Sequence, residues 1–124
     1  MRTLLLLLAW LAFLVTSLAV RFAGFTRVHR RVRQWRVSRS RRRPSIEMLR
    51  DAIEAAARWT LLPVQCLERA AVTTCLFRTF GYDAAFVIGV RRTPFYAHAW
   101  TELDGAVLTD PAERVRELAV VERC

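Results

Sequence analysis

The sequence predicts an α+β fold in which a helix that carries a cysteine packs on an antiparallel sheet. Residues 46–60 and 64–80 have apolar side chains at helical spacing, and residues 84–90 form a short apolar run rich in β-forming residues. After them comes Asp104-Gly105, a dipeptide typical of the tight turn between two strands. The order helix, helix, strand, strand, strand places the second helix against one face of the sheet.

Residues at their ends mark both predicted helices. Ser45 is a good N-cap for the helix over 46–60, and Glu47 brings negative charge to its first turn. Pro63 breaks the chain before the second helix, and Gly81 follows the end of that helix, where a left-handed residue is usual.

The last third of the chain holds the predicted strands. We expect a buried strand over 84–90, a turn over 91–94 and a hairpin over 96–110. The tail over 111–122 has a weak helical stripe, and Pro111 suits the first position of a helix. Three strands should therefore be followed by a short helix.

Charge divides the chain into two parts. All 20 basic residues are arginines; residues 1–43 hold 11 of them and no acid, whereas residues 44–124 hold nine against 11 acids. Apolar residues make up 54% of the 124, enough for the core of one small domain. We predict an apolar, Arg-rich helical lead-in over 1–43 and one folded domain over 44–124.

The lead-in begins with 18 uncharged residues, 3–20. As a helix they would extend about 27 Å, which is marginal for a bilayer core of about 30 Å. Nine arginines follow between 27 and 43 and oppose translocation, so secretion is the least supported reading. Two readings stay open: membrane contact through 3–20, or a helix that packs on the domain or on a partner. We expect the domain in the cytoplasm or on the cytoplasmic face of the membrane.

The Arg-rich segment could contact nucleic acid through charge alone. Trp35 by itself, however, offers no stacking platform for bases. A solvated basic helix, a patch on anionic lipid or a dock for an acidic partner fits the same residues. We therefore predict no specific nucleic-acid partner.

Cysteine usage argues against a disulfide framework and a structural zinc site. The chain has three cysteines, an odd number, and no short-spaced pair among them. This usage suits a reducing compartment, and we predict neither a metal nor a cofactor.

Cys66 has the position of a nucleophile. It lies in the first turn of the predicted second helix, where the helix dipole favours a thiolate and backbone N–H groups could hold an oxyanion. Cys75 is nine residues on, faces the other side of the helix and suits the core. We expect no role for Cys124.

The hairpin YAHAWTELDGAVLTD, residues 96–110, carries a histidine and an aspartate on its two arms. A two-residue loop, Asp104-Gly105, would put His98 and Asp110 on opposite faces, because side chains alternate along a strand. A three-residue loop that includes Leu103 would set His98 opposite Asp110, with glycine in the left-handed position. We predict the three-residue loop, because it lets the carboxylate orient the imidazole.

Cys66, His98 and Asp110 would then supply a nucleophile, a base and an orienting group. Distinctive motifs surround them: CLERA at 66–70, FG at 80–81, VIGVR at 87–91, AHAW at 97–100 and the Asp-Gly hairpin that ends at Asp110. With these motifs the stretch over 45–110 resembles the transglutaminase-like cysteine protease that removes leader peptides in lasso-peptide biosynthesis.

The resemblance implies a small transglutaminase-like (papain-like) fold and a bacterial, cytoplasmic cysteine protease with Cys66, His98 and Asp110 as its catalytic triad. Its substrate would be a ribosomally made precursor peptide, cut just after the leader. Its partners would be a small leader-recognition protein and an asparagine-synthetase-like macrolactam cyclase that closes the ring.

In the implied mechanism Cys66 attacks the scissile carbonyl, His98 transfers the proton and Asp110 fixes the histidine tautomer. Trp100 shares the face of His98 and either shields the site or packs in the core. Two other functions fit the residues: another Cys-His-Asp amidase or acyltransferase, and a non-catalytic adaptor held at a membrane or a partner.

Overall fold

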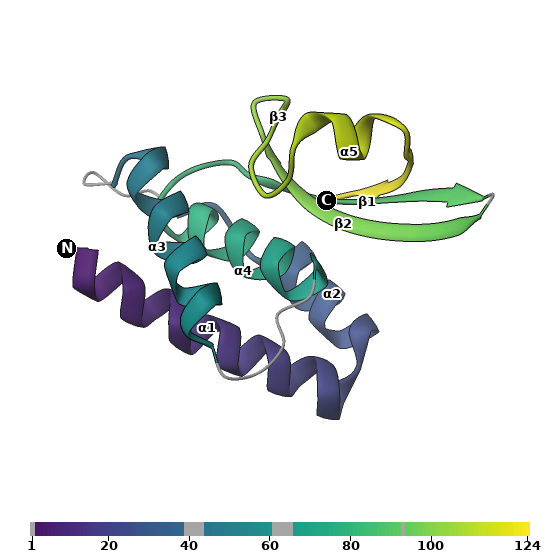
Figure 1. Cartoon of the computed structure of the whole chain (residues 1–124). Helices are drawn as coiled ribbons and strands as arrows, with labels where there is room; N and C mark the ends of the chain where they lie inside the picture. Colours follow the sequence, from purple (N-terminus) through teal and green to yellow (C-terminus); the bar gives the residue numbers. More distant parts are fainter. Residues whose placement is uncertain (1, 39–43, 61–65, 93) are drawn as a thin grey trace.

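The helices and the sheet form two layers (Figure 1). The computed structural model describes residues 2–38, 44–60, 66–92 and 94–124. Helices α1 to α4 lie on one side of the sheet and the short α5 on the other (Figure 1), which confirms the predicted α+β class. The elements are, in chain order, α1 (Arg2–Ala23), α2 (Phe25–Gln34), α3 (Ile46–Trp59), α4 (Cys66–Thr79), β1 (Ala85–Arg92), β2 (Phe95–Leu103), β3 (Ala106–Val107), α5 (Ala112–Arg116) and β4 (Ala119–Arg123).

Helices α3 and α4 correspond to the two helices expected from the sequence. At the start of α3 the Ser45 hydroxyl accepts a hydrogen bond from the Met48 N–H at 3.1 Å, which is the expected cap. After α4 the Gly81 backbone is left-handed (φ 95°), and its N–H donates to the Arg78 carbonyl at 3.1 Å. The first residues expected for the second helix lie outside the described ones.

One face of α1 packs on α3 and α4. Two readings of residues 3–20 were left open, membrane contact and a packed helix. For this face of α1 the structure shows the packed helix. The core crosses the predicted boundary at residue 43, since α1 lies before it and the two other helices after it. By length and composition α1 is also able to cross a membrane. The buried side chains shared by the three helices are Leu5, Ala9, Phe13, Leu49, Ile53, Ala56, Val72 and Phe77.

The sheet is antiparallel, with the strand order β3-β2-β1-β4. The short helix predicted in the tail over 111–122 is α5, but the weak helical stripe beyond Arg116 was misleading, because residues 119–123 form strand β4 and pair with β1. The sequence Ala-Val-Val favours a strand, and the edge of β1 supplies backbone hydrogen-bond partners. The backbone of Cys124 continues this pairing with two hydrogen bonds of 2.9 Å to Phe86, whereas the absence of a role for its thiol stays a prediction.

Both turns of the sheet are shorter than predicted. Strand β1 runs on into the residues expected for the turn over 91–94. The predicted three-residue loop of the second hairpin is also wrong, because Leu103 pairs with Ala106 and Asp104-Gly105 alone make the turn. Both turn residues are left-handed, with φ angles of 52° and 81°. A two-residue hairpin turn needs this backbone geometry, which Asp-Gly adopts at little cost.

Arg78 joins the helical layer to the sheet. Its buried guanidinium donates to four backbone carbonyls, those of Val32, Trp35, Ala84 and Cys124, at distances of 2.7–3.1 Å. These carbonyls lie in or next to α2, β1 and β4. The fixed fan of arginine donors satisfies all four acceptors, which lets a charged group be buried here.

Candidate active site

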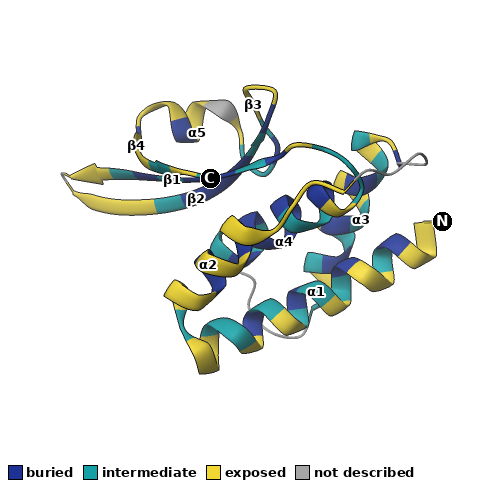
Figure 2. Cartoon of the chain, turned by 180° about the vertical axis from the view of Figure 1, so that it is seen from behind, coloured by how far each residue is buried: buried dark blue, intermediate teal, exposed yellow. Residues whose placement is uncertain are grey.

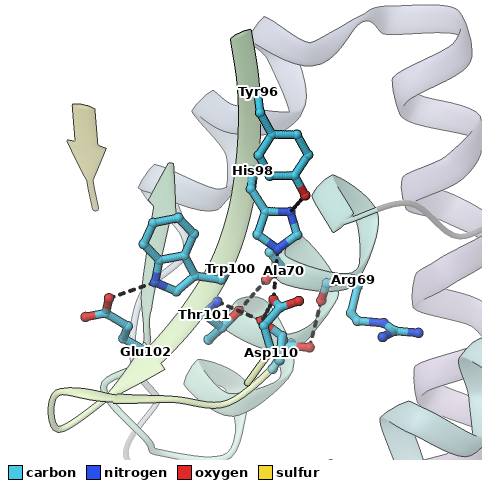
Figure 3. Close-up of polar contacts among 10 residues, drawn as sticks. Arg69, Ala70, Tyr96, His98, Trp100, Thr101, Glu102 and Asp110 are labelled. Atoms are coloured by element: carbon cyan, nitrogen blue, oxygen red, sulfur yellow. Dashed lines mark hydrogen bonds and ion pairs between the residues drawn. The ribbon is translucent and has the colours of Figure 1, made fainter. Parts of the chain in front are cut away.

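His98 lies in a row of side chains on one face of β2 (Figure 3). Tyr96, His98, Trp100 and Glu102 alternate along the strand and so point to the same side. The Tyr96 and His98 rings are stacked with centroids 5.8 Å apart, and the His98 and Trp100 rings are stacked at 6.2 Å. The Trp100 indole N–H donates to Glu102 at 2.8 Å. The imidazole is therefore held between two aromatic rings.

Gly89 on β1 makes room for this row. It pairs with His98 in the register of β1 and β2. A Cβ at this position would lie 2.5 Å from Cη2 of Trp100 and 3.0 Å from Cβ of Leu118. The absence of a side chain thus lets the indole lie across β1 beside the imidazole.

The imidazole of His98 meets the carboxylate of Asp110. Nε2 lies 3.1 Å from Oδ2, and the two side chains are only 10% and 13% exposed. The N–H is poorly aligned with the oxygen, so the contact is a close electrostatic approach rather than a well-formed hydrogen bond. On the other side of the ring the Tyr96 hydroxyl lies 3.3 Å from Nδ1. Because a carboxylate only accepts hydrogen bonds, this arrangement assigns the proton to Nε2 and leaves Nδ1 as an acceptor.

Asp110 reaches His98 by a backbone route that differs from the predicted one. With a two-residue turn, strict alternation would put the two residues on opposite faces. The ladder instead ends after Leu108, whose N–H donates to the Thr101 carbonyl at 2.8 Å. The Thr101 N–H then donates to the Thr109 hydroxyl at 3.2 Å, and that hydroxyl donates to Oδ2 of Asp110 at 3.1 Å. This break in the ladder turns Asp110 toward His98.

Cys66 is the first residue of α4, the helix that packs against β2. One turn on, the Ala70 carbonyl accepts a hydrogen bond from the buried Thr101 hydroxyl at 2.9 Å (Figure 3). This bond fixes the first half of α4 against the strand that carries His98. In the described part of the chain, no hydrogen bond joins Cys66 to His98 or Asp110. The structure thus brings His98 and Asp110 together and places a partly buried Cys66 at the helix N-terminus.

The other two cysteines have thiols that ionise poorly. Cys75 packs against the core between the helices and the sheet, as expected, and burial raises its pKa to about 11 although Arg78 and Arg31 act to lower it. Burial is also the main cause that raises the pKa of Cys124. Among the described residues, no group of three or more His, Cys, Asp and Glu side chains is placed to hold a metal ion.

Two residues of this site, Tyr96 and Thr109, were not predicted from the sequence. Tyr96 lies two residues before His98, so the strand alternation that placed Trp100 on the face of His98 would have found it. Thr109 carries no such signal, because its role depends on where the ladder ends.

Comparisons with known proteins agree with this architecture. A family model described as the transglutaminase-like superfamily matches residues 10–123. The microcin J25-processing protein McjB of Escherichia coli is 36% identical over 56 residues, which cover 45% of this chain and 27% of McjB. The aligned part is thus about a quarter of the length of this curated relative. No solved structure gives a significant match. Because the family match covers most of the chain, the protein belongs to the transglutaminase-like superfamily.

Proposed function

We propose that the protein is a cysteine peptidase that removes the leader from a ribosomally made lasso-peptide precursor. The observation that carries this proposal is the close approach of His98 and Asp110 on the sheet against which the Cys66 helix packs. Membership of the transglutaminase-like superfamily supports a cysteine-dependent reaction. The similarity to a microcin J25-processing protein supports the substrate class that the sequence motifs suggested.

The proposed reaction proceeds through an acyl-enzyme. The Cys66 sulfur attacks the carbonyl carbon of the last leader residue, and the thiol proton passes to Nδ1 of His98. Asp110 stabilises the imidazolium ion that forms, and the backbone N–H of Cys66 donates to the oxyanion. The C–N bond then breaks, His98 returns the proton to the departing amine, and the leader remains as a thioester. Water hydrolyses the thioester, which releases the leader carboxylate and restores the thiol.

Tyr96 takes part in the resting state of this site. Its hydroxyl is hydrogen-bonded to Nδ1 of His98, the atom that must receive the thiol proton. The side chain is 45% exposed, so an incoming substrate could reach it. Displacement of the hydroxyl by the substrate would therefore couple substrate binding to activation of His98.

The product chemistry suggests the partners. Cleavage leaves the core peptide with a free N-terminal amine, the nucleophile that an asparagine-synthetase-like macrolactam cyclase needs for ring closure. A small leader-recognition protein would present the leader to the peptidase. These steps belong in the cytoplasm, where the ribosomally made precursor is produced.

The test is cleavage of the genuine precursor, with and without the leader-recognition protein, followed by mass spectrometry. Wild type should release a leader-length fragment, Cys66→Ala should release none, and Cys75→Ala serves as the matched cysteine control. His98→Ala and Asp110→Asn should each slow cleavage. Cleavage by Cys66→Ala at the wild-type rate would refute the proposed triad.

Two further readouts separate the other functions that fit the residues. An added amine would appear in the leader product if the enzyme is an acyltransferase, because it would replace water in the second step. Undiminished lasso-peptide production in cells that carry Cys66→Ala would instead favour a non-catalytic adaptor.

A further inference from the structure

The outer face of α1 is apolar along its whole length. Large side chains recur there every three or four residues, and an exposed stripe of this extent marks contact with another apolar surface. In Figure 2 exposed residues follow the outer sides of α1 and α2. The stripe comprises Leu4, Leu7, Leu11, Val15, Leu18 and Phe22, whose exposed fractions run from 48% to 81%.

Helices α2 and α4 extend this apolar stripe into an open groove of about 630 Å³. Leu11 and Val15 line it from α1, and Arg27 and Arg31 line it from α2. Trp35 also lines the groove and is 39% exposed, with its indole N–H hydrogen-bonded to a hydroxyl of α4 at 3.0 Å. Apolar side chains, guanidinium groups and an indole thus share one surface.

Arg27 and Arg31, the arginines that line this groove, meet no acid from their own third of the chain. Residues 1–43 contain no acid. Arg33, on the same helix, forms an ion pair with Glu122 of β4. Among the described residues, neither Arg27 nor Arg31 has an ion-pair partner. A bilayer that contains anionic phospholipid matches this surface. Its acyl chains would contact the apolar side chains, and its phosphates would contact the unpaired arginines.

The contacts of the inner face of α1 limit the orientation that the helix can take on a bilayer. Leu5, Ala9 and Phe13 are buried against α3 and α4. A spanning orientation would remove these contacts, whereas an orientation in the plane of the interface keeps them. We propose that the outer face of α1, with Arg27 and Arg31, docks the folded protein on membranes that contain anionic phospholipid, with α1 parallel to the membrane surface. This proposal does not depend on the peptidase activity.

The test is flotation of the full chain with vesicles of phosphatidylcholine, with and without phosphatidylglycerol. We expect flotation with the anionic vesicles, much less with the neutral ones, and a loss of binding as the salt concentration rises. The double change Arg27→Gln and Arg31→Gln should lower the partition coefficient about 25-fold, since each cation near an anionic surface contributes about fivefold. Leu11→Ser with Val15→Ser should abolish flotation.

Matched controls use exposed residues elsewhere on the fold. Arg91→Gln with Arg92→Gln removes two exposed arginines of β1, and Val120→Ser with Val121→Ser removes two exposed apolar side chains of β4. Both control proteins should float like wild type, and far-ultraviolet circular dichroism should show all variants folded. Absence of flotation by the wild-type chain, or equal losses in the controls, would overturn the proposal. A wild-type chain that stays in solution while the α1 variants lose affinity for the leader-recognition protein would assign this face to a protein partner instead.

Discussion

Replacing Thr109 by valine would test whether the break in the β2–β3 ladder positions Asp110. The Thr109 hydroxyl accepts from the Thr101 N–H at 3.2 Å and donates to Asp110 at 3.1 Å. Valine keeps the shape of the side chain but can make neither hydrogen bond. The substitution therefore removes the link between the ladder and the carboxylate without creating a cavity.

The expected loss of stability follows from the burial of Thr101. Its side chain is fully buried, so we expect its N–H to gain no water in place of the lost hydroxyl. A buried donor without a partner costs about 1–3 kcal/mol. With a urea m-value of roughly 2 kcal/mol/M, the unfolding midpoint should fall by about 1 M.

The expected loss of activity follows from the freedom that Asp110 gains. Its carboxylate would keep the approach to His98 but lose the hydroxyl that holds it there. Misplacement of an orienting group by about 1 Å can cost roughly 100-fold in rate, so we expect leader cleavage to slow by about that factor.

Two assays on the same samples check this reasoning: urea unfolding followed by tryptophan fluorescence, and precursor cleavage. Thr109→Ser should restore both quantities, and Thr26→Val, at an exposed position of α2, should change neither. A wild-type unfolding midpoint for Thr109→Val would contradict the role of the hydroxyl in the ladder. A lowered midpoint with unchanged cleavage would show that Thr109 stabilises the fold without positioning Asp110.

Three further predictions concern the site and its surroundings. Gly89→Ala places a Cβ 2.5 Å from Trp100, so we expect a loss of about 1–3 kcal/mol in urea unfolding, and wild-type stability would contradict the close approach. Tyr96→Phe keeps the stacked ring but frees Nδ1 of His98, so iodoacetamide should alkylate the proposed nucleophile severalfold faster; a slower reaction would refute the competition for Nδ1. Burial raises the pKa of Cys75 from 9.0 to about 11, so its alkylation at about pH 8 should be roughly 100-fold slower than that of an ordinary thiol and should accelerate as the pH rises toward that pKa. Mass spectrometry of the alkylated peptides gives both rates, and an ordinary rate for Cys75 would contradict its burial.

Signals between residues close in the sequence predicted the helices. Strand pairing between distant residues could not be predicted in the same way. The caps at Ser45 and Gly81 depend on residues within one turn, so both were found from the sequence. Strand β4 was missed because its partner, β1, lies about 30 residues away and only the folded sheet brings the two edges together. The weak helical stripe of the tail over 111–122 therefore predicted the short helix α5 but gave no sign of the strand after it.

At the candidate site, too, the sequence predicted part of the arrangement and missed the part that depends on strand pairing. The sequence predicted that His98 and Asp110 meet, and they do. The predicted route was wrong, because a three-residue loop was chosen for its chemistry, whereas the Asp-Gly turn has its preferred two-residue geometry. The Thr109 hydroxyl holds Asp110 where the ladder ends, and this contact depends on where pairing stops. The participation of Cys66 stays a prediction.

The packing of α1 on helices that follow it in the chain has a consequence for synthesis. Its inner face is covered by α3, which ends at Trp59, and α4, which ends at Thr79. Translation at roughly 5–20 residues per second leaves α1 without these partners for several seconds after Ala23 is added. During that interval a 22-residue apolar helix exposes both of its faces. We therefore expect the yield of folded protein to depend on trigger-factor-like chaperones that shield α1 on the ribosome. We also expect the protein to aggregate more slowly at low growth temperature.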